Sequence, residues 1–144
     1  CNVMKKSILC VVLISLLLLC SCKSNNNLED ENIKLRIETI LENAIKGDTI
    51  SLDEVYVNDW DYYIIDSSYD FLSALDDLEV DNADSVNILE YQDNNCIVAF
   101  VKDDSVEAYA QITTKQDDGS SCLTKYLYQD KKQVYYKGTI LKVE

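Results

Sequence analysis

The stretch Cys96-Ile-Val-Ala-Phe-Val-Lys-Asp-Asp-Ser-Val106 decides the fold of this chain. Its first half is a continuous apolar run rich in β-branched residues, which is typical of a β-strand. Asp103 and Asp104 interrupt the run, and strand-like sequence resumes at Ser105. Two strand-like runs separated by two turn-forming residues predict a β-hairpin with antiparallel strands.

The strand predicted after this turn alternates between apolar and polar side chains. The apolar positions are Val106, Ala108, Ala110 and Ile112, and the positions between them are Glu107, Tyr109 and Gln111. Because successive side chains of a strand point to opposite faces, this pattern predicts one dry face and one solvated face. We expect helices to cover the dry face.

Further strand-like runs lie on both sides of the hairpin. They span about 85–92, 95–102, 105–114, 121–129 and 132–143, and short turns rich in Asp, Asn or Gly separate them. Short connections join antiparallel neighbours, so these runs predict a sheet that is mostly a meander. Gly138 in the last run is expected to mark a β-bulge.

Residues 54–57 and 59–66 also carry β-branched and aromatic residues and are expected to be strands. In the second of them, Asp59 and Asp61 would share one face and Trp60 the other. One interpretation is a carboxylate pair for a cation or a sugar. The other places Trp60 in the core with two solvated acids opposite. We favour the latter, because no third ligand follows at the spacing of a calcium loop.

Two helices are expected. Apolar residues recur at helical spacing over 28–46, where Asn27 could cap the helix and Gly47 could end it in the left-handed conformation. Residues 70–78 predict a short second helix, with Ser67 or Ser68 as its cap. The fold class is therefore α+β, with an N-terminal helix and a short second helix packed on one face of an antiparallel, mostly meander β-sheet of five to six strands.

The N-terminal segment predicts export. Two lysines precede an apolar stretch of 12 residues at 8–19, which is shorter than the ~20 residues of a membrane-spanning helix. The spacing Leu19-Cys20-Ser21-Cys22 resembles the lipobox of bacterial lipoproteins, which implies a lipid on Cys22. Cys20 is the rival position, but the residue before it is too bulky. We expect a signal peptide over 1–21, a lipidated cysteine and polar tether over 22–27, and a single α+β domain over 28–144.

Acidic residues dominate the charge of the chain. The formal net charge is -13, and it becomes -15 without the expected signal peptide. Residues 47–101 hold 14 acids and no base, whereas residues 115–142 hold six lysines. Nucleic acid and anionic lipid surfaces are therefore poor partners. The acidic run is either a solubilising face, which is the simpler interpretation, or a surface for a cation or a basic partner.

Six cysteines are present, but three lie in the expected signal peptide and Cys22 would carry lipid, which leaves Cys96 and Cys122. An exported compartment permits a disulfide between them. The predicted meander, however, puts them on strands separated by a third strand. Such second neighbours lie about 9.6 Å apart, beyond the limit of roughly 7 Å between the Cα atoms of a disulfide. We expect two buried thiols, with a bridge as the alternative.

Little in the sequence points to catalysis. The chain has no histidine, no phosphate-binding glycine loop and no metal-ligand spacing of Cys and His. Neither Cys96 nor Cys122 has a lysine or arginine beside it to activate the thiol. We therefore expect no catalytic residue, no metal and no cofactor, and the protein is expected not to be an enzyme.

The ten tyrosines are the remaining feature. Tyrosine is a good strand residue, but its rigid amphipathic ring is also favoured in recognition surfaces. Tyr126 and Tyr128 share one face of a predicted strand. The candidate partner-binding residues are thus Asp76, Asp77, Glu79, Asp81, Tyr126 and Tyr128.

Two segments of the body carry a resemblance. Residues 59–65, Asp-Trp-Asp-Tyr-Tyr-Ile-Ile, and the hairpin of residues 96–106 resemble a pattern of small α+β bacterial lipoproteins of unassigned function. More weakly, the hairpin is similar to that of SmpA/OmlA-type outer-membrane lipoproteins, which carry glycine where this chain has Asp104. The resemblance implies a fold and an anchored location, and it implies no active site.

The leading hypothesis is a non-enzymatic extracytoplasmic domain, anchored by lipid to the cell membrane or outer membrane, that binds another protein through its exposed sheet face. A basic protein is the candidate partner. A specific version is an immunity or inhibitor lipoprotein whose acidic residues neutralise a basic toxin or enzyme. The alternative is a module that binds a small ligand, such as a sugar, a peptide or a cation, for an envelope system.

Overall fold

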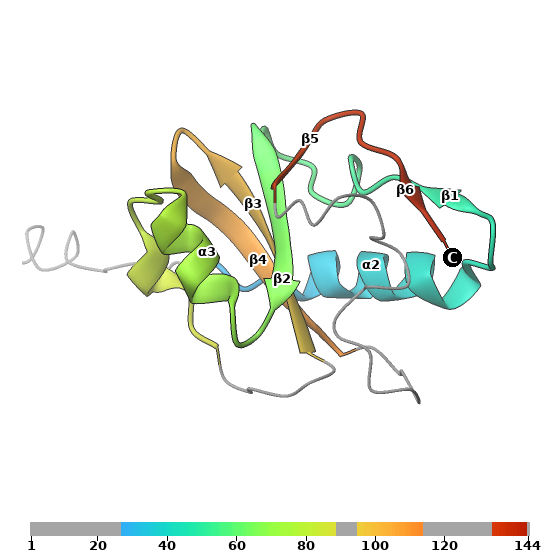
Figure 1. Cartoon of the computed structure of the whole chain (residues 1–144), viewed down its shortest axis with the longest axis horizontal. Helices are drawn as coiled ribbons and strands as arrows, with labels where there is room; N and C mark the ends of the chain where they lie inside the picture. The colour runs from blue at the N-terminus through green and yellow to red at the C-terminus, as the bar shows by residue number, and fades with distance from the viewer. Residues whose placement is uncertain (1–26, 89–94, 114–133, 144) are drawn as a thin grey trace, which may run out of the picture.

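The computed structural model describes residues 27–88, 95–113 and 134–143 (Figure 1). A four-stranded antiparallel sheet with the order β4-β3-β2-β5 forms its centre, and a two-stranded sheet joins β1 and β6. Among the described residues, no helix combines the length and the apolar character needed to cross a membrane. The elements are α2 (Glu31–Asn43), β1 (Thr49–Ile50), β2 (Tyr62–Ser67), α3 (Phe71–Asp77), the 3-10 helix η1 (Ala83–Ser85), β3 (Asn95–Lys102), β4 (Ser105–Thr113), β5 (Val134–Tyr136) and β6 (Leu141–Lys142).

The predicted α+β class with antiparallel strands is confirmed. Its centre is the expected hairpin of β3 and β4, which Asp103 and Asp104 connect. Both residues have positive φ, at 46° and 57°. Two successive residues with positive φ are typical of the type I′ turn, whose twist matches that of the strands it joins.

A β-bulge interrupts this hairpin. Phe100 pairs with Ala108, but the next residue of β3, Val101, pairs with Val106, which leaves Glu107 as an extra residue in β4. The extra residue reverses the side-chain alternation of β4. Val106 therefore belongs to a different core cluster from Ala108.

The predicted wet face of β4 is wrong, because the cluster that includes α3 covers this face of the sheet. Tyr109 was expected on the solvated face with Glu107, yet its side chain is buried. Its backbone pairs with the segment before α2, where Asp30 N–H donates to the Tyr109 carbonyl at 2.8 Å and Tyr109 N–H donates to the Leu28 carbonyl at 2.8 Å. The chain before α2 thus covers the outer edge of β4.

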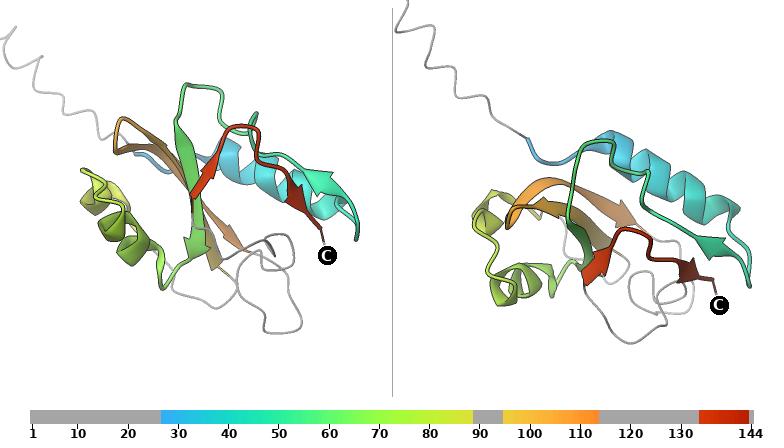
Figure 2. Two further views of the ribbon diagram at one scale, coloured as in Figure 1. Left: turned by 45° about the horizontal axis from the view of Figure 1, so that its top comes forward. Right: turned by 90° about the horizontal axis from the view of Figure 1, so that it is seen from above.

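The two helices lie on opposite faces of the sheet (Figure 2). One face of β3 packs with α2, and the other face packs with α3. On the first side the cluster includes Ile33, Ile37, Cys96, Val98 and Phe100, and on the second it includes Phe71, Leu75, Ile97, Ala99 and Val101. The expectation of both helices on one face is wrong, because β3 is apolar on both of its faces and each face needs a cover.

The strand order departs from the predicted meander. The run over 132–143 splits into β5, which pairs with β2, and β6, which pairs with β1. Gly138 has a φ of 83° between them and forms a turn rather than a bulge. The expected strand over 85–92 is also wrong as far as it is described, because Ser85 belongs to η1 and residues 86–88 form no strand. The run over 121–129 lies outside the described residues.

The elements before β2 are shorter than the sequence suggested. α2 begins after Asp30, whose Oδ1 accepts the Asn32 N–H at 2.8 Å, so Asp30 and not Asn27 is its cap. Gly47 has a φ of 95° but lies beyond the end of the helix. Residues 54–57 form no strand, because a turn occupies residues 53–55, and β2 begins only at Tyr62. The N-cap of α3 is Asp70, so the expectation of Ser67 or Ser68 is wrong, although the Oγ of Ser67 accepts the Asp70 N–H at 3.2 Å.

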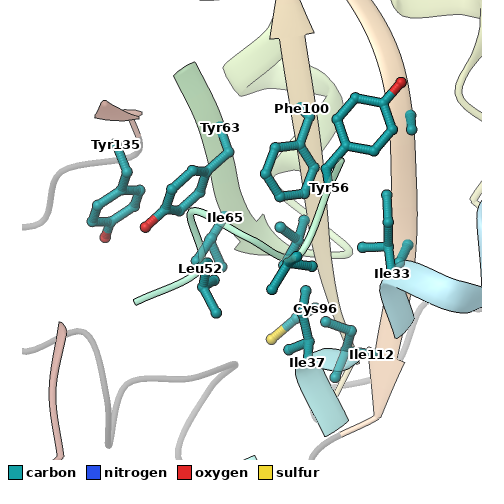
Figure 3. Close-up of a cluster of buried hydrophobic side chains, with 14 of the residues drawn as sticks. Ile33, Ile37, Leu52, Tyr56, Tyr63, Ile65, Cys96, Phe100, Ile112 and Tyr135 are labelled. Atoms are coloured by element: carbon teal, nitrogen blue, oxygen red, sulfur yellow. The ribbon is translucent and has the colours of Figure 1, made fainter. Parts of the chain in front are cut away.

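Aromatic rings fill the core on the α2 side (Figure 3). Tyr63 stacks on Tyr135 with ring centroids 5.3 Å apart, and Trp60 lies edge-on to Phe100 at 5.4 Å. Trp60 is only 2% exposed, which confirms the interpretation that places it in the core. Aromatic pairs of this geometry add to the stability that burial alone provides.

Cys96 lies in the same core and is disulfide-bonded. It is the only cysteine among the described residues, so its partner lies outside them. The expectation of a reduced thiol at Cys96 is therefore wrong. That expectation depended on a continuous meander beyond β4, and the observed sheet does not continue as one, because β5 joins β2 on the other side of β3.

Candidate functional site

Seven exposed carboxylates gather where α3 ends and the β3–β4 turn begins, and we call this surface the acidic corner. Its residues are Asp76, Asp77, Glu79, Asp81, Asp84, Asp103 and Asp104. Four of them were predicted as partner-binding residues from the sequence, and all four are exposed in the structure. The fold thus brings the two aspartates of the turn next to the predicted acidic run.

Hydrogen bonds hold the two segments of the acidic corner together. Asp81 N–H donates to the carbonyl of Asp104 at 2.9 Å. Asn82 forms two bonds with the backbone of Val106, in which its Oδ1 accepts the N–H at 2.7 Å and its Nδ2 donates to the carbonyl at 3.0 Å. Figure 2 shows the resulting contact between the segment around η1 and the hairpin. The carboxylates therefore sit on a fixed surface and not on separate loops.

Bases do not neutralise this surface. In the described part of the chain, the segments that form the acidic corner contain no lysine or arginine. The nearest base in sequence is Lys102, and its Nζ lies 3.0 Å from Asp59 Oδ2 and 3.1 Å from Asp61 Oδ1. Because these two aspartates lie outside the corner and already engage Lys102, the corner keeps most of its negative charge.

Asp59 and Asp61 form a structural ion cluster beside the acidic corner. Hydrogen bonds from Lys102 and then from Lys137, together with the charges of both lysines, lower the pKa of Asp59 from 3.8 to about 2. A hydrogen bond from the Asp103 N–H, followed by one from Lys102, lowers the pKa of Asp61. The pKa of Lys102 is raised by the same two aspartates. These mutual shifts are those of carboxylates used as ion-pair partners.

The ion cluster also ties three segments together. Lys137, from the turn after β5, pairs with Asp59 Oδ1 at 3.1 Å and lies 4.9 Å from the ring centroid of Trp60. Asp61 Oδ2 accepts the N–H of Asp103 at 2.9 Å and so supports the positive φ of the β3–β4 turn. The carboxylate pair proposed from the sequence for a cation or a sugar is thus occupied by lysines of the chain itself.

Two tyrosines that the sequence did not single out lie next to the acidic corner. Tyr62 of β2 and Tyr136 of β5 face each other edge-on, with ring centroids 6.1 Å apart. Tyr136 is 64% exposed. Tyr62 pairs with Val101 of β3, three residues before Asp104. Burial, and then the negative charge of Asp104, raises the pKa of Tyr62. No sequence pattern could have paired them, because 73 residues separate the two strand positions.

The other predicted site residues lie outside the described part of the chain. They are Tyr126 and Tyr128, the candidate aromatic residues, and Cys22, the candidate lipidation site. Tyr135, by contrast, belongs to the core. Among the described residues, no group of three or more acids or cysteines is arranged to hold a metal ion.

The comparisons with known proteins add no assignment. No protein-family model, no curated protein and no solved structure matches this chain. The chemistry of the described surface therefore has to carry the functional argument.

Proposed function

We propose that the chain is a non-enzymatic, lipid-anchored extracytoplasmic domain that binds a basic protein through the acidic corner. The observation that carries the proposal is the fixed group of seven exposed carboxylates without a base among them. Complementary charge accelerates association and selects against partners of the same sign. An immunity or inhibitor protein for a basic toxin or enzyme is the specific form of this function.

Tyr62 and Tyr136 supply the second component of the proposed surface. Charged groups at the edge of an interface mainly affect the association rate, whereas buried aromatic side chains near its centre carry most of the binding energy. The tyrosine pair lies beside Asp104 and one ring is largely exposed. It therefore offers the apolar anchor that an acidic surface alone lacks.

The location rests on the sequence, with one supporting observation from the structure. A disulfide at Cys96 fits an oxidising compartment, where exported proteins are found. The anchor is tested by mass spectrometry of the mature N-terminus, which should carry a diacylglyceryl group on Cys22. The same group on Cys20 would contradict the lipobox assignment.

The binding function is tested with charge variants of equal net charge. In one variant Asp76, Asp77, Glu79 and Asp81 become the corresponding amides. In the control, four acids outside the corner, Glu31, Glu38, Glu42 and Glu54, become glutamines. Used as baits on solubilised envelopes, the wild type and the control should retain a basic protein at low salt that the corner variant releases.

The kinetics of the captured protein complete the test. We expect the corner variant to associate about tenfold more slowly at low salt, with the difference shrinking as salt is added. Tyr136→Ala should instead accelerate dissociation. Equal loss in the corner variant and in the control would show that net charge alone matters, and it would refute a specific surface.

A further inference from the structure

A second candidate site lies apart from the acidic corner, between α2 and the segment that follows β1. It is a cavity of about 630 Å³, and none of its lining residues belongs to the acidic corner. Cavities of roughly 300 to 1,000 Å³ are typical of small-molecule sites. The lining residues are Leu35, Arg36, Thr39, Ile40, Ser51, Asp53, Glu54 and Val55.

Apolar side chains form much of this cavity. Leu35 is 58% exposed although it is a large apolar residue, and Ile40 and Val55 flank it in the same lining. Exposed apolar surface inside a concavity favours an occupant with an apolar body. A purely apolar occupant, however, would make no use of Arg36 and Asp53, which also line the cavity.

Arg36 is held in place but keeps unused hydrogen-bond donors. Its Nη1 donates to the carbonyl of Val55 at 3.0 Å and to that of Glu54 at 3.4 Å. No ion pair of the described residues includes Arg36, although the chain has twice as many acids as bases. A guanidinium carries five N–H donors, and its remaining edge can receive a carboxylate in the two-pronged geometry that arginine favours.

Asp53 supplies the opposite charge in the same cavity. Its Oδ2 accepts the N–H of Gly138 at 2.8 Å, which fixes the carboxylate. Its Oδ1 is buried and makes no hydrogen bond within the described part of the chain. The residue as a whole is partly exposed and belongs to the cavity lining, so its carboxylate presents a negative charge to a ligand.

We propose that this cavity binds a small zwitterion with an apolar side chain, namely a free apolar amino acid. Its carboxylate pairs with the open edge of Arg36, and its ammonium group pairs with Asp53. Its side chain covers Leu35, Ile40 and Val55. This assignment gives Arg36, Asp53 and the apolar lining a function, because Arg36 and Asp53 line one cavity without pairing with each other. Glu54, the third charged residue of the lining, contacts Arg36 through its backbone carbonyl.

Three probes with the same apolar body test the proposal. L-Phenylalanine carries both charges, 3-phenylpropionate lacks the ammonium group, and phenethylamine lacks the carboxylate. In titrations of the isotope-labelled domain, L-phenylalanine should shift the amide signals of Leu35, Thr39 and Val55 in a saturable way. Its dissociation constant should be at least about tenfold lower than that of either single-charge probe, since each missing group loses a charge-assisted hydrogen bond.

Variants of the lining residues test which residue binds which group of the ligand. Asp53→Asn keeps an acceptor for Gly138 and should reduce the affinity for L-phenylalanine to that for 3-phenylpropionate. Leu35→Ala, at an exposed position that folding tolerates, should weaken all three probes. Glu42→Gln makes the same charge change on α2 outside the cavity and should change nothing. Equal binding of the three probes, an unaffected Asp53→Asn variant, or no shift in these amides would each overturn the proposal and leave the binding function of the acidic corner untouched.

Discussion

Asp59 and Lys102 show how single residues stabilise the turn beside the acidic corner. The pKa of Asp59 is lowered from 3.8 to about 2 by hydrogen bonds from Lys102 and Lys137, so the folded state favours the ionised form. A group with a lowered pKa contributes stability above its unfolded pKa and loses that contribution as the pH falls through its folded pKa. The contribution of Asp59 is therefore complete above about pH 4 and lost toward about pH 2.

The lowered pKa of Asp59 gives the first prediction. Asp59→Asn should lower the melting temperature at neutral pH, and its difference from the wild type should shrink as the pH falls from about 4 to about 2. Thermal unfolding followed by circular dichroism at several pH values measures the difference. Asp84→Asn, at an exposed acid outside the ion cluster, serves as the control. A difference that stays constant over this pH range would contradict a role for the ionised carboxylate.

Two buried tyrosines should respond in opposite ways to loss of the hydroxyl. Tyr63 is fully buried and its hydroxyl makes no hydrogen bond in the described part of the chain. The hydroxyl of Tyr109 accepts the Asn87 N–H at 3.1 Å and donates to the Asn87 carbonyl at 3.2 Å. Removing a buried hydroxyl without a partner is neutral or stabilising, whereas removing one that satisfies two backbone groups exposes their desolvation cost.

We therefore expect Tyr63→Phe to unfold at the same urea concentration as the wild type or at a higher one. Tyr109→Phe should lose about 1 to 2 kcal/mol of unfolding free energy. The pair is its own control, because both changes remove one oxygen from a core ring. A clear loss of stability in Tyr63→Phe would contradict this expectation and show that the hydroxyl has a partner, for which the carboxylate of Asp53, whose charge raises the pKa of Tyr63, is the candidate.

At the scale of elements, the hairpin was predicted correctly, but the placement of the two helices on the sheet was not. Asp103-Asp104 between two strand-like runs specified β3, its turn and β4, because a two-residue turn leaves few other geometries. The bulge at Glu107 has no sequence signature, so the move of Val106 to the same face as Tyr109 could not be foreseen. The uninterrupted apolar run of β3 did carry information, since a strand that is apolar on both faces needs a cover on both. That feature predicts helices on opposite faces.

The positive φ angles of the hairpin turn yield a prediction at this scale. Asp104 has a φ of 57°, in the left-handed region that costs an ordinary residue energy and glycine almost none. Asp104→Gly should therefore raise the unfolding free energy by about 0.5 to 1 kcal/mol, less than the full strain because glycine also gains freedom in the unfolded chain. Urea unfolding measures the gain.

Asp104→Asn separates backbone strain from charge in the same experiment. Asparagine removes the charge and tolerates the left-handed region better than most residues, but it keeps its Cβ. We expect it to fall between the wild type and Asp104→Gly. If the two variants are equally stable, then charge repulsion within the acidic corner explains the gain and backbone strain does not.

At the scale of the whole molecule, the sequence predicted part of the acidic corner, namely its residues from the acidic run. The run of 14 acids is visible in the sequence, and its exposed members lie where it suggested. The contribution of Asp103 and Asp104, and the tyrosine pair beside them, comes from contacts between distant segments. Local sequence patterns do not predict such contacts, because the contacts depend on the strand order β4-β3-β2-β5.

The proposed anchor would hold the acidic corner close to the membrane. The described chain begins at Asn27, which lines a cavity with Asn82 and Glu107 next to the corner. Five residues after Cys22 reach at most about 17 Å even when fully extended. A partner of the anchored protein would therefore meet the corner near the bilayer surface, where the carboxylates would attract a basic partner.

The disulfide of Cys96 connects the fold to the compartment of the whole molecule. Four of the other cysteines lie in the expected signal peptide or at the expected lipidation site, so we expect Cys122 to be the partner. A disulfide that closes the loop between Cys96 and Cys122 should stabilise the domain by roughly 2 to 4 kcal/mol. Reductant should thus lower the melting temperature of the mature domain. Cys96→Ser should lower it at least as much, because it also places a hydroxyl in the core, and it should abolish the response to reductant. Peptide mapping without reduction should recover one peptide pair that contains Cys96 and Cys122. Labelling of Cys96 by a thiol reagent in the unfolded, unreduced domain would contradict the bridge, and it would remove the structural support for an oxidising compartment.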